Sequence, residues 1–481
     1  MPFCVQKCNY CSFLSFDAEG SPRREYIEAL SEEIKLRAQG AGESAGSSKS
    51  READMISGGN TGSRSIRACA ADRGPIDTVY IGGGTPSVMD ISQLSELVKL
   101  LRRSYDIKEE AEVTLEANPA TLGRKDGVML AKLQAYRFMG INRVSMGVQS
   151  MDNDRLHYLG RLHTAENIAR DMELLRRKGF DNINLDLIFS VPGESAEDAL
   201  EDLEKILKFE PEHISCYSLQ IEEGTPFGRM AEAGELTEVP DEEDRETYHR
   251  ICRALCDAGY EHYEISNFAK VPGGGRGAGF DGAESKGTAG FDVADKGTAG
   301  FDGADNGDVR FDDAGRSAGM SPYRSKHNSL YWNMDEYIGL GLGASGFAGG
   351  VRYKNTTDLD EYISELKAGR LPVAEEHVNT AFDNISEAVF TGLRRREGIT
   401  YEEAVRTYLD TIERERSSGT GEKTGESDGS GAEELFWQIF RDAKEEAGKY
   451  AERGLLVIDS EGLRLTEQGI DISNSIMSLF V

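Results

Sequence analysis

The sequence predicts an α/β fold in which parallel strands form an open or partial barrel. Five short β-rich runs recur between residues 77 and 221, and segments with helical apolar spacing lie between them. Such alternation implies parallel strands joined by crossover helices. Glycine or polar residues gather at the carboxyl ends of the runs, where ligands bind in parallel α/β folds. A doubly wound sheet is the main structural alternative.

The expected elements follow one another at short, regular intervals. The predicted strands are 77–83, 111–118, 142–149, 182–190 and 213–221. The predicted helices include 91–103, 124–138, 164–178 and 196–207. With one more strand expected near the N-terminus, the pattern favours a partial (β/α)6-type barrel.

The carboxyl ends of these strands carry residues that suit ligand binding. They are Gly82, Gly83, Gly84, Glu116, Asn118, Gln149 and Asp186. A glycine run at a strand end lets backbone groups approach a ligand without obstruction by side chains. A single polar strand end is ordinary turn chemistry, whereas several on one rim would form a binding site.

The last part of the chain predicts an α-rich, winged-helix-like domain. Helical apolar spacing covers 385–399 and 434–454, and 454–469 is expected to form a hairpin before a final helix. Winged helices often bind DNA, but residues 433–481 carry ten acidic and five basic side chains. An accessory or docking module therefore fits better than a DNA reader.

Three glycine-rich stretches interrupt the globular pattern. They lie at 40–74, 271–320 and 417–432, and they hold 26 of the 54 glycines, so they are expected to be flexible insertions. The second carries a degenerate repeat with Phe280, Phe291, Phe301 and Phe311. The repeat has two interpretations: an expansion of the gene by replication slippage, or a calcium-binding repeat. The predicted domains are a barrel (1–270), the insertion 271–320, a connecting region (321–375) and the C-terminal domain (376–481).

Charge and hydropathy exclude several classes of partner. The formal net charge is −30, with 85 acidic and 55 basic residues, which disfavours nucleic acid. No run of 18 apolar residues and no signal peptide occur, so neither a transmembrane helix nor export is expected. The expected location is the cytoplasm, where clustered cysteines more often bind metal than form disulfides.

The cysteine cluster at the N-terminus is the strongest chemical signal. Cys4, Cys8 and Cys11 have the spacing C-x3-C-x2-C, with Tyr10 directly before the third cysteine. A structural zinc site closes with four ligands, and no other cysteine is an obvious fourth by spacing. A [4Fe–4S] cluster held by three thiolates leaves one iron open for a chelating small molecule. Tyr10 would shield such a cluster from solvent.

This motif resembles that of the radical S-adenosylmethionine (SAM) superfamily. In that superfamily the methionine amino and carboxylate groups chelate the open iron, and electron transfer cleaves the sulfonium. Within this resemblance, Gly83, Gly84 and Thr85 of "IGGGTPS" correspond to the turn that holds the methionine amino group.

Further segments resemble the oxygen-independent coproporphyrinogen III oxidase-like family within that superfamily. "GGGTPS", "EANPATL", "GVQSMDNDRLHYLGRLHT", "NLDLIFSVPGES", "YSLQIEEGTPF", "YEISNFAK" and "HNSLYW" occur in the family's order and cover most of the chain outside the insertions. The family comprises the coproporphyrinogen III dehydrogenase and related heme chaperones. The resemblance implies a [4Fe–4S] cluster, S-adenosyl-L-methionine and an electron donor.

The resemblance also assigns site residues. It implies that Cys4, Cys8 and Cys11 bind the cluster and that Tyr10 lies over the cofactor. It implies that Glu116, Gln149, Arg161 and Asp186 hold the nucleoside and carboxylate of S-adenosylmethionine, through hydrogen bonds that suit each residue type. Taken alone, Glu116 or Asp186 would be read as a helix cap or a surface salt bridge.

Two features favour the heme chaperone branch, whose partners are heme and heme-acceptor proteins. Phe13 stands where the dehydrogenase has a further cysteine, and "HNSLYW" resembles a segment that the chaperones use near heme. His327 would then ligate heme iron, or else pack in a strand-end loop. The alternatives are the dehydrogenase, which decarboxylates two propionates of coproporphyrinogen III, and a zinc-only regulatory protein.

The chain departs from the family at two places. The family has a strand before the first cysteine, whereas here that cysteine is Cys4, so the first barrel strand is expected to be missing. Ser345 stands in "GLGASG" where the family usually has a histidine.

Overall fold

The computed structural model describes residues 1–39, 74–123, 125–273, 310–311, 317–318, 320–418 and 431–481. Most of the three glycine-rich insertions, with the repeat phenylalanines Phe280, Phe291 and Phe301, lie outside the described residues. Phe311 belongs to a two-residue strand, β10 (Arg310–Phe311), which pairs with β11 (Ser317–Ala318). In the part that is described, no helix combines the length and apolar character needed to cross a bilayer.

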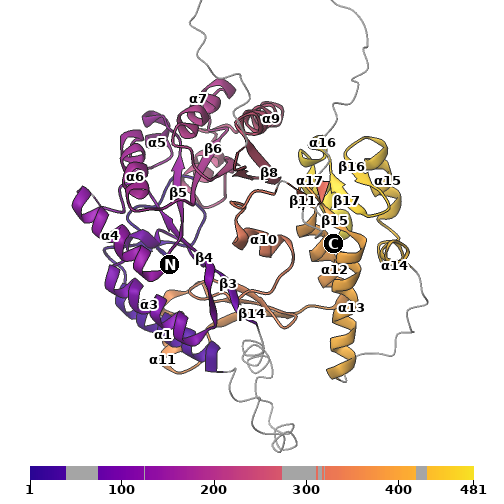
Figure 1. Ribbon diagram of the computed structural model, residues 1–481, viewed down its shortest axis with the longest axis horizontal. Coiled ribbons are helices and arrows are strands. Elements are labelled where there is room, and N and C mark those ends of the chain that lie inside the picture. Colours follow the sequence, from indigo (N-terminus) through magenta and orange to yellow (C-terminus); the bar gives the residue numbers. More distant parts are fainter. Residues whose placement is uncertain (40–73, 124, 274–309, 312–316, 319, 419–430) are drawn as a thin grey trace, which may run out of the picture.

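A seven-stranded sheet forms the centre of the molecule (Figure 1). Its strands are, in spatial order, β3 (Ile76–Ile81), β4 (Ile107–Ala117), β5 (Arg143–Gln149), β6 (Ile183–Phe189), β7 (His213–Ser218), β9 (Asn267–Lys270) and β8 (Tyr260–Glu264). The first five are parallel, and β9 and β8 are antiparallel. Because the parallel strands follow chain order without a reversal, the fold is a partial barrel and the doubly wound alternative is wrong.

Helices cover the outer face of this sheet (Figure 1). They are α1 (Arg23–Gln39), α3 (Ile91–Ser104), α4 (Asp126–Met139), α6 (Ala165–Arg177), α7 (Ala196–Leu207) and α9 (Asp241–Asp257). The short helices α5 (Asn153–Tyr158) and α8 (Pro226–Glu232) lie in strand-to-helix connections. The amphipathic spacing of α3, α4, α6, α7 and α9 buries their apolar faces against the sheet, as the sequence pattern predicts, whereas α1 packs on α3 and α11 (Leu359–Lys367).

The N-terminal residues run alongside the end of β3. The Met1 amino group donates to Gly82 O (2.8 Å), and the amides of Gly84 and Thr85 donate to Met1 O (2.7 Å) and Phe3 O (2.8 Å). Strand β1 (Phe3–Cys4) also pairs in parallel with β2 (Phe16–Asp17). Among the described residues, no strand pairs with β3 on the side away from β4. The parallel part of the sheet therefore starts at β3, and the expected N-terminal strand is a two-residue segment outside it.

The connecting region contains a helix and a small sheet. Helix α10 (Lys326–Trp332) packs on β3. Strands β12 (Ser345–Ala348), β13 (Val351–Asn355) and β14 (Val373–Val378) form an antiparallel sheet, and α11 (Leu359–Lys367) packs on α1. The prediction that His327 lies in a strand-end loop is wrong, because the Ser325 hydroxyl accepts from the Asn328 amide and starts a helix there.

The C-terminal domain has the predicted combination of helices and hairpin. Its helices are α12 (Ala381–Gly392), α13 (Tyr401–Ser418), α14 (Ala432–Ile439), α15 (Lys444–Glu452), α16 (Glu467–Ile470) and α17 (Ser473–Met477). The wing consists of β15 (Ile399–Thr400), β17 (Gly462–Leu465) and β16 (Leu456–Ile458). The helix expected over 434–454 is broken between α14 and α15, where Phe440 packs on Phe436 and Phe480.

One continuous apolar core joins the barrel to the C-terminal domain. It extends from Leu115 and Leu185 in the sheet to Ile385 and Phe436 in the C-terminal helices. Backbone hydrogen bonds also cross this junction, since the amide of Ile265 donates to Arg394 O at 3.2 Å. The C-terminal domain therefore packs firmly on the barrel at the β8–β9 edge, whereas the boundary proposed at residue 376 stays a prediction.

Candidate functional site

A cavity of about 450 Å³ opens at the carboxyl ends of the parallel strands. Every predicted site residue except His327 lines it: Cys4, Cys8, Tyr10, Cys11, Gly83, Gly84, Thr85, Glu116, Gln149, Arg161 and Asp186. They come from the N-terminal loop, from four strand ends and from the segment after α5. The convergence of strand ends that the sequence predicts is therefore present.

Hydrogen bonds join the loop that carries the three cysteines to the residues at the end of α5. The Asn9 amide donates to Leu159 O (3.0 Å), and the Asn9 side-chain amide donates to Tyr158 O (2.8 Å). Cys4 Sγ lies 3.4 Å from Thr85 Oγ1, and Cys8 Sγ accepts from Arg161 Nη1 at 3.4 Å. The protein thus orients the thiols through its own contacts.

The donor set fits a [4Fe–4S] cluster. Three cysteine thiols from one short loop line the same cavity, and a cubane takes each thiolate on a different iron. Burial raises the pKa of the Cys11 thiol, and the neighbouring Cys8 and Cys4 raise it further. Bound iron would relieve this effect by taking the thiolates as ligands.

The glycine turn after β3 lies against a buried carboxylate. The Gly83 amide, with φ of 118°, donates to Glu116 Oε2 (2.9 Å), and the Tyr80 hydroxyl donates to Glu116 Oε1 (2.8 Å). Burial raises the pKa of Glu116, although both hydrogen bonds favour its ionised form. Glu116 therefore holds the glycine turn in place, and its carboxylate also lines the cavity.

Arg161 connects the cysteine loop to two strand ends. Its Nη2 donates to Asn118 Oδ1 and to Gly147 O, both at 2.5 Å. Asn118 in turn donates to Thr85 Oγ1 at 2.9 Å. A Cβ at Gly147 would lie 2.8 Å from Asn118 Oδ1, so a side chain there would have to displace Asn118. A network from Cys8 through Arg161 and Asn118 to Thr85 therefore joins two sides of the cavity.

Gln149 and Asp186 complete the rim. Gln149 ends β5 with φ of 72°, a left-handed conformation that is costly for a residue with a side chain. Asp186 Oδ1 accepts from the Asn184 side chain at 2.7 Å, and burial raises its pKa. Hydrogen bonds from Asn184 and Ser215 and the charges of Arg143 and Arg161 favour the ionised form of this carboxylate, which can accept from a ligand's hydroxyl or amino group.

His327 lies elsewhere, on a second cavity of about 770 Å³ beside β3. Its Nδ1 is 2.8 Å from Thr78 Oγ1, its Nε2 is 2.9 Å from Tyr331 Oη, and its ring stacks on Tyr80. Burial lowers the pKa of His327 to about 4, so the imidazole is neutral at physiological pH. Both ring nitrogens are engaged, so iron ligation would require one of these hydrogen bonds to break.

Phe13, which distinguishes the family branches, and Ser345, at which the chain departs from the family, are both at the surface. Phe13 lies at the edge of the cysteine-lined cavity, and its side chain is 70% exposed. Ser345 is exposed at the start of β12, where it lines the second cavity.

Three lining residues were not assigned roles from the sequence. Asn118 was noted only as a polar strand end, and Tyr80 and Arg143 were not singled out. The period-two alternation of strands could have found Arg143, because Arg143, Ser145, Gly147 and Gln149 share one face of β5. The same alternation applies to Tyr80, which lies two residues before Gly82 and therefore on the same face of the strand.

Comparisons with known proteins agree with this geometry. A sequence model described as "Radical SAM superfamily" matches residues 63–206. The chain is 27% identical to a protein of Lactococcus lactis named "Heme chaperone HemW", over 100% of this chain and 96% of that protein. It is also 27% identical to the protein of the same name in Bacillus subtilis, over 100% and 97% of the two chains.

The solved structures include one with the same overall fold. The coproporphyrinogen III oxidase (HemN) of Escherichia coli, described as a radical SAM enzyme, superimposes with a TM-score of 0.68. The match covers 100% of this chain and 88% of that one at 18% sequence identity. At that identity the likeness concerns the fold.

Proposed function

We propose that the chain, of which residues 63–206 match the radical SAM superfamily, is a heme chaperone that binds a [4Fe–4S] cluster and S-adenosyl-L-methionine and passes heme to acceptor proteins. The observation that carries the cofactor part is the single cavity shared by the three cysteines, the glycine turn and the polar strand ends. The observation that carries the heme part is the similarity, along almost the whole length, to proteins named heme chaperones.

The residues present suit these cofactors. Cys4, Cys8 and Cys11 would hold the cluster, and Arg161 offsets the negative charge of Cys8. When bound, the cluster would supply the electron for cleavage of the sulfonium of S-adenosylmethionine, and a separate electron donor would be needed to reduce it. Thr85 and the backbone of the glycine turn bind and orient the methionyl end. Glu116, Gln149 and Asp186 offer acceptors and donors for the nucleoside hydroxyl groups.

Heme is proposed to bind at the segment that contains His327. The imidazole is neutral, as an iron ligand must be. To bind iron, one ring nitrogen would give up its hydrogen bond with Thr78 or with Tyr331, which costs one hydrogen bond between neutral groups. The adjoining cavity offers apolar walls from α1 and α3. The reducing cytoplasm is the proposed location, since the cluster needs free thiols.

An anaerobic heme titration tests this proposal. The reconstituted full chain should shift the Soret band of heme until near-equimolar addition. His327→Ala should weaken that binding by about tenfold or more, the cost of a lost ligand bond. His377→Ala is the control, because the His377 side chain is 64% exposed and pairs with Asp383 at the surface.

The same preparation distinguishes the second candidate function. Conversion of coproporphyrinogen III to protoporphyrinogen would replace the chaperone assignment by that of a dehydrogenase. We expect none, because Phe13 stands where the dehydrogenase resemblance requires a cysteine. The absence of any heme-dependent spectral change would overturn the heme part, and absence of iron and sulfide after reconstitution would overturn the cofactor part.

A further inference from the structure

Tyr80 on β3 lies between the cavity that the cysteines share and the second cavity beside β3. Among the described residues, it is the one side chain that lines both, since the other shared residue, Gly83, has no side chain. The Tyr80 ring also packs against Gly82, where a Cβ would lie 2.7 Å from Tyr80 Cε1. A shift of this ring therefore changes the wall of both cavities.

Each end of the Tyr80 side chain contacts a residue of one proposed ligand site. The hydroxyl donates to Glu116 Oε1 at 2.8 Å, in the cavity that the cysteines share. The ring stacks on the His327 imidazole, with 4.9 Å between the ring centroids and 19° between the ring planes. Because the aromatic ring and its hydroxyl move as one rigid body, a ligand that fixes the hydroxyl also fixes the face on which His327 packs.

The central sheet holds most of the His327 imidazole. Thr78, two residues before Tyr80 on the same face of β3, has its hydroxyl 2.8 Å from Nδ1. The His327 amide donates to the buried Glu112 carboxylate on β4 at 3.1 Å, which places the start of α10. Of the two ring nitrogens, Nε2 has its partner on α10 itself, the Tyr331 hydroxyl at 2.9 Å. Nε2 is therefore the nitrogen that can exchange its partner for iron, while Thr78 keeps Nδ1 and the ring plane in place.

We propose that Tyr80 is a positioning residue through which S-adenosylmethionine and heme promote each other's binding. A nucleoside hydroxyl group on Glu116 keeps this carboxylate, and with it the Tyr80 hydroxyl, in place. The Tyr80 ring then holds the imidazole with Nε2 accessible to iron, so heme binding has less freedom of motion to remove. This inference rests on the proposed function and deepens it. Linkage requires the effect of each ligand on the other to be equal.

Titrations of one ligand in the presence of the other test this coupling. They are done anaerobically and without a reductant, so that S-adenosylmethionine stays intact. In the reconstituted wild type, saturating S-adenosylmethionine should lower the Kd for heme about fivefold or more, and saturating heme should lower the Kd for S-adenosylmethionine by the same factor. Tyr80→Phe keeps the ring but loses the bond to Glu116, so this factor should fall to about one. A wild-type factor of about one, or an undiminished factor in Tyr80→Phe, would overturn the proposal.

Tyr260→Phe is the matched control. It also removes a buried tyrosine hydroxyl, which donates to Pro211 O at 2.6 Å, but Tyr260 lines neither cavity. This variant should therefore keep the coupling factor of the wild type. If coupling is lost in Tyr260→Phe as well, the loss is a general effect of destabilisation and Tyr80 has no specific role.

Histidine NMR spectra of the ligand-free chain give a readout that needs neither ligand. The chain has seven histidines, so after labelling of histidine with nitrogen-15 the His327 signals can be identified by their loss in His327→Ala. Tyr80→Phe should shift these signals, because the bond to Glu116 no longer holds the ring against the imidazole, and Tyr260→Phe should not. Unchanged signals in Tyr80→Phe would contradict the positioning role. If the wild type binds no heme or no S-adenosylmethionine, the proposed function is wrong, and the spectra alone decide the role of Tyr80.

Discussion

Gly84 marks the closest backbone approach in the candidate site. A Cβ at this position would lie 2.8 Å from Phe3 N and Phe3 O, closer than side-chain carbons come to backbone atoms. The glycine run was predicted to clear space for a ligand. In the structure it also admits the chain's own N-terminal segment, which leads directly into Cys4. The position of one cluster ligand thus depends on the absence of a side chain at Gly84.

Gly84→Ala should therefore disturb the cysteine loop. The added methyl group has to displace backbone at Phe3, so we expect a loss of about 1–3 kcal/mol in stability, as for an overpacked core. We also expect less iron per chain after anaerobic reconstitution. Gly127→Ala is the control, because a Cβ there has nothing within 4 Å and alanine favours a helix. Equal iron content and melting temperature in both variants would show that the N-terminal segment does not need this contact.

The regular elements of the barrel could be predicted from the sequence, and the irregular ones could not. Strands β5 and β6 and helices α6 and α7 lie within about two residues of their predicted ranges, because their apolar periods are clear. Helix α10 was missed because seven residues contain too few turns to show a period. The β8–β9 hairpin was missed because its pairing with β7 depends on tertiary contacts.

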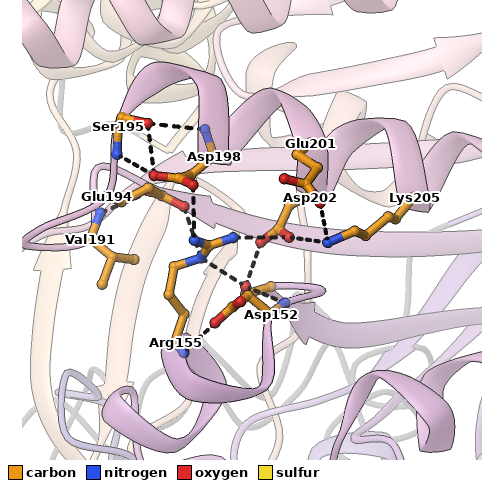
Figure 2. Close-up of polar contacts among 10 residues, drawn as sticks. Asp152, Arg155, Val191, Glu194, Ser195, Asp198, Glu201, Asp202 and Lys205 are labelled. Atoms are coloured by element: carbon orange, nitrogen blue, oxygen red, sulfur yellow. Dashed lines mark hydrogen bonds and ion pairs between the residues drawn. The ribbon is translucent and has the colours of Figure 1, made fainter. Parts of the chain in front are cut away.

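The loop between β6 and α7 contains a carboxylic acid whose ionisation should affect stability (Figure 2). Glu194 is 2% exposed, accepts from the Val191 amide at 3.1 Å and lies 3.3 Å from Arg155 Nε. Burial raises the pKa of Glu194 from 4.5 to about 7, despite Arg155. Because the folded state holds this proton more tightly than the unfolded chain, the group stabilises the fold below about pH 4.5. That contribution is lost as the pH rises through about 7.

Glu194→Gln should remove this part of the pH dependence. The difference in unfolding free energy between wild type and variant should change by on the order of 3 kcal/mol from pH 4.5 to above 7. Urea unfolding at several pH values measures it. Glu201→Gln on α7 is the control, since the Glu201 side chain is 64% exposed and pairs with Lys205 at the surface. Parallel pH profiles for wild type and Glu194→Gln would contradict the assignment.

At the scale of the whole molecule, the first helix is held by hydrogen bonds to the connecting region, which lies more than 300 residues away in the sequence. The Glu33 carboxylate on α1 accepts from Arg37 Nε (2.8 Å), Asn355 Nδ2 (2.8 Å), the Gly341 amide (2.8 Å) and Tyr362 Oη (2.7 Å). All of these contacts are buried. No sequence pattern indicates this cluster, because a buried Glu–Arg pair has the same i,i+4 spacing in the sequence as a pair on a helix surface.

Replacing Glu33 should therefore loosen the molecule as a whole. Glu33→Gln leaves the Arg37 guanidinium group buried without its anion, and we expect a loss of about 3–5 kcal/mol in the free energy of unfolding. Glu28→Gln breaks an ion pair of the same spacing on the same helix, but its partners are 61% and 84% exposed, so no measurable loss should follow. Urea unfolding followed by circular dichroism compares the two. If the two variants unfold at the same urea concentration, the contacts between α1 and the connecting region do not hold the barrel together, and its stability must come from the apolar core alone.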